Sequence, residues 1–159
     1  MGDDAVFHML AAAPFAAGYR ERDERGRARL DQVFQACARE CSRGSLEAGW
    51  DFATDLEDTS LDDRLEGEQL EAWQELRATL LASEACPWFE RFYDARDARG
   101  GVVEPQALAR LVGRLRETGV LPALAAALDA DDTPSGFAEL DEFLQRAAGA
   151  GAWLVWYSR

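Results

Sequence analysis

Apolar residues recur every three or four positions in several segments of the chain, which is the spacing of amphipathic helices. The clearest such segments are 28–43, 65–83, 104–119 and 137–148. Gly44 follows the first segment, Pro105 lies at the start of the third, and Gly119 ends it, as expected for helix boundaries. This pattern predicts a chain built mainly from helices.

Weaker helix signals lie between these segments. Ser45 has the side chain of an N-cap for a helix that would carry Leu46 and Trp50 on its apolar side. Pro87 and Pro122 each occupy a position typical of a first helical turn. We therefore expect short helices to begin at all three places.

The C-terminal run AWLVWYS, residues 152–158, is apolar, aromatic and short, which is typical of a buried strand. A lone strand leaves its backbone N–H and C=O groups unpaired, so this one needs partners. The candidates are Val102–Val103 and Ala5–Leu10, where the pattern leaves strand and helix open. We therefore expect a mostly helical α+β fold in one domain, residues 1–159, with a small sheet joining the chain ends.

The composition limits the class of protein. With 159 residues, 48% of them hydrophobic and 30% charged, the chain matches a folded globular domain. No apolar run is long enough to cross a membrane. The start MGDDAVFHMLAAAPF carries two aspartates and lacks the positive charge of a secretory signal. We therefore expect a cytoplasmic protein.

Two segments resemble a known family. The ending GFAELDEFLQRAAGAGAWLVWYSR, a helix that leads through a glycine turn into a final apolar strand, resembles the ending of the YfbM-like family of small uncharacterised bacterial proteins. The stretch GVVEPQALARLVGRL is similar to that family's middle helix. Together the two segments cover roughly a quarter of the chain. The family has no established activity, so no site residue follows from the resemblance.

Absent and rare residue types exclude several chemistries. The chain has no lysine, which removes Schiff-base and phosphate-loop chemistry based on that residue. His8 is the only histidine, so two-histidine metal sites are excluded and a Ser-His-Asp triad would have to use it. Cys37, Cys41 and Cys86 have the ligand types of a zinc site with His8. Because Cys37 and Cys41 fall on an apolar helix stripe, we interpret them as inert buried thiols.

The net charge of −13 disfavours nucleic acids and anionic membranes as partners, since both carry negative charge. The acidity is concentrated between Glu47 and Glu75, where eleven carboxylates stand against a single base, Arg64. This segment accounts for −10 of the net charge. The acidity is therefore a local feature, and a local feature of this kind can form a recognition surface.

A metal site is one reading of these carboxylates. Asp55, Asp58 and Asp62 are spaced to lie on one face if their segment is helical, and Mg²⁺ or Ca²⁺ prefers such oxygen ligands. Glu68 and Glu71 supply half of the paired acidic motif of a helical nucleotide pyrophosphatase. The nearest second half, Glu90 with Asp94, has a spacing one residue too long.

The favoured reading is a solvated acidic face that binds a basic protein, because catalytic acids are few and set among apolar groups. We predict a non-enzymatic binding module, an immunity or antitoxin type of inhibitor, with no catalytic residue, bound metal or cofactor. The alternatives are a small Mg²⁺-dependent hydrolase and a structural domain without a dedicated site. The predicted partner-binding residues, acids with two aromatic anchors, are Asp51, Asp55, Glu57, Asp58, Asp62, Asp63, Glu66, Trp88 and Tyr93.

Overall fold

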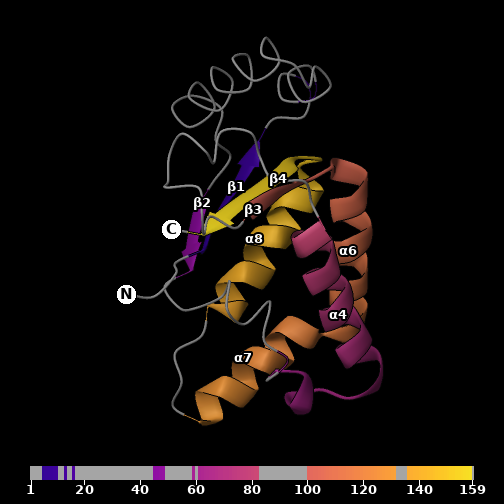
Figure 1. Cartoon of the computed structure of the whole chain (residues 1–159), viewed down its shortest axis with the longest axis vertical. Helices are drawn as coiled ribbons and strands as arrows, with labels where there is room; N and C mark the ends of the chain where they lie inside the picture. Colours follow the sequence, from indigo (N-terminus) through magenta and orange to yellow (C-terminus); the bar gives the residue numbers. More distant parts are fainter. Residues whose placement is uncertain are drawn as a thin grey trace.

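A four-stranded antiparallel sheet packs one of its faces against a layer of helices (Figure 1). The computed structural model describes residues 5–10, 13, 16, 45–48, 59, 61–82, 100–131 and 136–158. The strands are β1 (Ala5–Leu10), β2 (Ser45–Ala48), β3 (Gly100–Val103) and β4 (Trp153–Ser158). The helices are α4 (Gly67–Ala82), α6 (Pro105–Thr118), α7 (Val120–Ala130) and α8 (Phe137–Gly149), with the 3₁₀ helix η2 (Asp62–Arg64) before α4.

The sheet has the strand order β2-β1-β4-β3, so β4 lies between β1 and β3. In the antiparallel register with β1, Phe7 pairs with Trp156 and Met9 with Leu154. On the other side of β4, Val103 also pairs with Leu154. The prediction of a mostly helical α+β fold whose small sheet includes the C-terminal strand is therefore confirmed. The two expected strand partners are confirmed as well.

Both faces of β4 are buried between Trp153 and Trp156. Leu154 and Trp156 belong to the core shared with the helices, and both side chains are fully buried. Val155, which points to the opposite face, is equally buried. A strand buried on both faces has a continuous apolar sequence rather than an alternating one, and the run WLVW in β4 has that form.

The start of a helix at Ser45 was a wrong prediction. Ser45–Ala48 forms β2, which pairs with β1 through the registers Ala5 with Ala48 and His8 with Ser45. This pairing supplies hydrogen-bond partners to the backbone of β1 on the side away from β4. Pairing with a distant strand therefore overrides the local N-cap signal of a serine.

The helices contribute apolar faces to a single core with the sheet. Apolar residues at helical spacing on α4, α6 and α8 contact this core; they are Leu70, Trp73, Leu76, Leu80, Leu108, Leu111, Val112, Leu115, Leu140, Phe143 and Leu144. Phe7 stacks on Trp156 with ring centroids 6.2 Å apart and an interplanar angle of 22°. Trp73 meets Phe137 edge to face at 5.8 Å, which joins α4 to α8.

Gly119 separates α6 from α7 and serves both. It has φ 65° and ψ 27°, and its N–H donates to the carbonyl of Leu115 as the C-cap of α6. The next helix begins directly at Val120, two residues before the predicted start at Pro122. Pro122 is tolerated there because the first N–H groups of a helix have no partner within it. The left-handed backbone at Gly119 allows the chain to change direction between the helices within one residue (Figure 1).

Two glycine substitutions are expected to change stability in opposite directions. In both positions a new Cβ would meet no atom within 4 Å, so only the backbone conformation differs. Gly119→Ala places a side chain on a positive φ and is expected to lower the free energy of unfolding by about 1 kcal/mol. Gly113→Ala, within α6, is expected to raise it by up to about 1 kcal/mol. Urea denaturation of both variants checks this, and equal signs would contradict it.

Candidate functional site

Only part of the predicted partner-binding surface lies within the described residues. Asp51, Asp55, Glu57, Asp58, Trp88 and Tyr93 lie outside them, as do the three cysteines and the pair Glu90 and Asp94. Asp62, Asp63 and Glu66 are described, and all three precede α4 within a few residues. The site is therefore built from the start of α4 and the helices that contact it.

The segment before α4 is a short turn held by two leucines. Leu61 and Leu65 are both 6% exposed and belong to the core, while η2 fills the space between them. Leu65 is extended, and Gly67 has φ 57° where α4 begins. Thr59 is not helical, so no continuous helix runs through it to Asp62. Asp62 therefore cannot lie on one continuous helix with Asp55 and Asp58, as the metal-site reading required. The chain forms a turn here, which buries Leu61 and Leu65.

Asp62 is paired within the chain. Arg77, on α4, donates from Nη1 to Oδ1 at 3.0 Å and from Nη2 to Oδ2 at 3.2 Å. The two side chains are 18% and 19% exposed, so the pair is largely shielded from water. Two parallel charge-assisted hydrogen bonds fix the relative orientation of the two side chains, and the arginine neutralises the charge of the carboxylate. Asp62 therefore holds η2 against α4 and is not available as an uncompensated charge.

A second arginine compensates the negative charge of the acids in the first half of α4. Arg114, on α6, lies 3.5 Å from Glu75 and 3.7 Å from Glu71 on α4, and 4.0 Å from Glu117 on its own helix. Each pair is solvent-accessible and contributes little stability alone, but one guanidinium shared by three carboxylates lowers their mutual repulsion. The sequence pattern missed this role of Arg114 because it lies outside the acidic segment and reaches it only in the fold.

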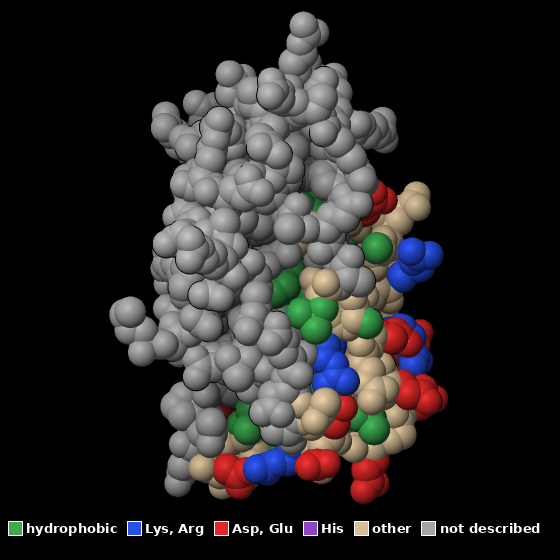
Figure 2. All heavy atoms as spheres, in the orientation of Figure 1, with side chains coloured by type: hydrophobic (Ala, Val, Ile, Leu, Met, Phe, Trp, Pro, Cys, Tyr) green, Lys and Arg blue, Asp and Glu red, His purple; other side chains and the backbone are tan. Residues whose placement is uncertain are grey.

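The start of α4 keeps uncompensated acids. Asp63, Glu66 and Glu68 are exposed, and no ion pair joins any of them to another residue of the described ranges. We call these three residues the α4-entry acids. Glu68 lies in the first turn of α4, where an acid interacts favourably with the helix dipole and stabilises the helix by a few tenths of a kcal/mol, roughly. Figure 2 shows acidic and basic side chains side by side along the described edge of the molecule.

Metal-ligand geometry is absent from the part of the chain that the structure describes: no group of three or more His, Cys, Asp or Glu side chains there is placed to hold an ion. Glu68 and Glu71, the first half of the predicted pyrophosphatase motif, are both exposed on α4. Glu71 contacts Arg114. A cation in that position would have to compete with a guanidinium.

His8 has a structural environment. It lies on β1 opposite Val155, on the sheet face away from the helical core, and is half-buried. Burial lowers the pKa of His8 below its ordinary value because the imidazolium loses hydration there. The structure therefore favours the neutral ring.

Within the described segments, no helix is both long and apolar enough to cross a lipid bilayer. Comparison with protein-family models finds no match for this chain. Curated proteins give none either, and the same holds for solved structures. The resemblance to the YfbM-like family therefore stays a prediction.

Removal of the Asp62–Arg77 pair is expected to destabilise the protein. Either Asp62→Asn or Arg77→Met should lower the free energy of unfolding by about 1–3 kcal/mol, because each leaves a partly buried charge without its partner. The double variant should be less destabilised than the sum of the two, which a double-mutant cycle measures. Asp63→Asn, an exposed neighbour, is the control and should change stability by less than about 0.5 kcal/mol. Additive effects in the cycle would contradict the pairing.

His8 is expected to make stability pH-dependent. Its folded pKa lies below the unfolded value near 6.5, so below that pH the unfolded chain binds a proton that the folded chain resists. The His8 contribution is therefore fully present above about pH 6.5 and is lost as the pH falls toward the folded pKa, with a slope of at most about 1.4 kcal/mol per pH unit. The measurement is the unfolding free energy of the natural chain minus that of His8→Gln, between pH 8 and pH 5. A difference that does not change with pH would contradict this.

Proposed function

We propose that this protein is a non-enzymatic binding module of the immunity or antitoxin type, which acts in the cytoplasm and neutralises a basic protein partner. The observation that supports this most directly is the state of the α4-entry acids. They are exposed and have no ion-pair partner among the described residues, whereas the neighbouring Asp62, Glu71 and Glu75 are paired with arginines of the same chain. Along α4 and the turn that precedes it, the uncompensated charge therefore lies where the helix begins.

Such a surface suits recognition of a basic partner. A cluster of exposed carboxylates raises the association rate with a basic protein and orients that protein during the encounter. Their mutual repulsion disfavours the folded chain slightly, and a bound cationic surface would remove that repulsion. The helix dipole accounts for some acids at a helix start, but its effect is confined to about one turn.

Pairing with arginines of the same chain also decides which acids are accessible to a partner protein. Asp62 is held by two hydrogen bonds, so a partner would have to displace Arg77 to reach its carboxylate. Asp63 follows it directly and has no such restraint. We therefore place Asp63 and Glu66 at the centre of the described part of the surface. The other predicted residues lie outside the described part of the chain and stay part of the proposed surface; they are Asp51, Asp55, Glu57, Asp58, Trp88 and Tyr93.

A matched pair of variants tests the proposal. The first, Asp63→Asn with Glu66→Gln and Glu68→Gln, removes the α4-entry acids. The second, Asp129→Asn with Glu139→Gln and Glu142→Gln, removes three exposed carboxylates on α7 and α8 and changes the net charge equally. Affinity capture from the native cell lysate at low salt should retain one stoichiometric basic protein on the natural chain and on the second variant.

With that protein purified, the association rate should fall roughly tenfold for the first variant and less for the second, and the difference should shrink at high salt. Equal rates for the two variants would show that only the overall charge matters and would contradict a defined site. A natural chain that retains no stoichiometric basic protein would contradict the function itself.

A further inference from the structure

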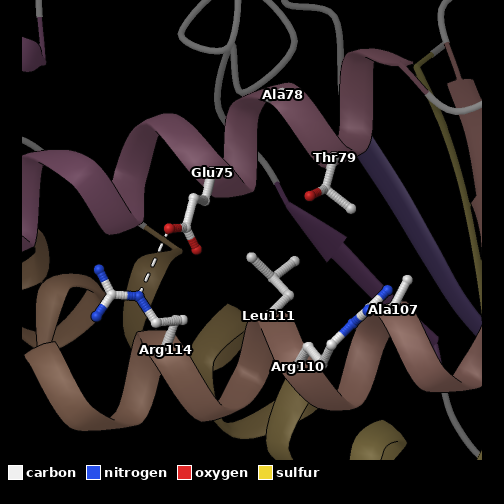
Figure 3. Close-up of a pocket in the computed structure, with 7 residues that line it drawn as sticks. All are labelled: Glu75, Ala78, Thr79, Ala107, Arg110, Leu111 and Arg114. Atoms are coloured by element: carbon white, nitrogen blue, oxygen red, sulfur yellow. Dashed lines mark ion pairs between the residues drawn. The ribbon is translucent and has the colours of Figure 1, made fainter.

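A groove runs between α4 and α6, apart from the α4-entry acids, and has a volume of about 450 Å³ (Figure 3). Two alanines explain why it is hollow. Ala78 on α4 and Ala107 on α6 line it, and their methyl groups leave space between the two helices. Leu111, only 4% exposed, forms an apolar floor. The centre of the groove is therefore apolar and shaped for a compact group.

The two ends of the groove differ in charge. At one end, Glu75 pairs with Arg114, and the same guanidinium also contacts Glu71 and Glu117. Three carboxylates around one arginine leave this end negative. Arg110 lies toward the other end, where its side chain extends toward Ala107 in Figure 3. No ion pair within the described ranges involves Arg110.

A hydroxyl faces the same space. Thr79, on α4, is half-buried, and its Oγ1 points toward the centre of the groove in Figure 3. It makes no hydrogen bond to another residue that the structure describes. A guanidinium and a hydroxyl from two different helices thus line one apolar hollow, each with hydrogen-bonding capacity left over.

We propose that this groove binds a small organic monocarboxylate with a compact apolar body. The carboxylate accepts hydrogen bonds from Arg110 and from the Thr79 hydroxyl, while the apolar body lies on Leu111 between Ala78 and Ala107. A dianion such as a phosphate ester is disfavoured, because the carboxylates around Arg114 repel additional negative charge. A cation is disfavoured by Arg110. The site does not depend on the proposed partner surface.

The test uses the full chain and benzoate as the probe, with benzamide as its uncharged isostere. Titration is followed by the methyl NMR signals of Ala78 and Ala107. The groove is open to solvent, so we expect a Kd of about 1 mM for benzoate. Benzamide should bind at least about tenfold more weakly, since it forms no charge-assisted hydrogen bond with Arg110.

Three variants localise the site. Arg110→Gln should weaken benzoate binding about tenfold or more, and Ala107→Leu should abolish it by filling the hollow. Arg116→Gln removes an exposed charge from the same helix outside this groove and should leave the Kd unchanged within about twofold. Circular dichroism of each variant establishes that it is folded.

Benzoate binding that requires Arg110 and an unfilled groove, and that survives Arg116→Gln, supports the site. Equal binding of benzoate and benzamide would overturn the assignment of a carboxylate. Equal weakening by Arg110→Gln and Arg116→Gln would show that only general charge attraction is at work. The absence of shifts at Ala78 and Ala107 up to about 20 mM, well above the expected Kd, would overturn the groove as a binding site.

Discussion

The backbone of β4 imposes the requirement on which the described fold depends. Leu154 and Val155 point to opposite faces of the sheet and are both fully buried, so the strand has no water to satisfy its N–H and C=O groups. β1 and β3 supply these partners, one from the start of the chain and one from its middle. The pairing brings the start and the end of the described chain together. Because α8 leads directly into β4, it also fixes where α8 packs against the other helices (Figure 1).

Aromatic contacts in the core also determine where the charged residues of α4 lie. Trp156 on β4 stacks on Phe7, and Trp73 on α4 meets Phe137 on α8. Trp73 is fully buried, so the rotation of α4 about its axis is fixed. Residues on the opposite side of that helix must then face outward, and Glu71 and Glu75 come to lie beside Arg114 of α6. The positions of the acids are therefore a consequence of the core.

Local signals in the sequence were sufficient for α4, α6, α8 and β4, because apolar spacing and helix-ending glycines such as Gly119 act over a few residues. The helices predicted at 28–43 and from Pro87 lie outside the described residues. They were insufficient for β2. The N-cap preference of Ser45 is a local signal, whereas its pairing with His8 joins residues far apart in the sequence. The same limit applied to the site. The acidic segment was visible as composition, but its compensation by Arg77 and Arg114 depends on contacts across 15 residues and between helices. Unpaired acids can be distinguished from paired ones only in the fold.

Arg114 divides the exposed surface of α4 and α6 into two regions with different chemistry. Its contacts with Glu71, Glu75 and Glu117 place a cluster with a net charge of about −2 between the α4-entry acids and Arg110. A basic protein approaching the start of α4 therefore meets negative charge that continues along the helix. An anion in the groove is restricted to the Arg110 end by the same cluster. Removal of the Arg114 charge would thus strengthen attraction of a cation and weaken that of an anion, which links the two surfaces through one guanidinium.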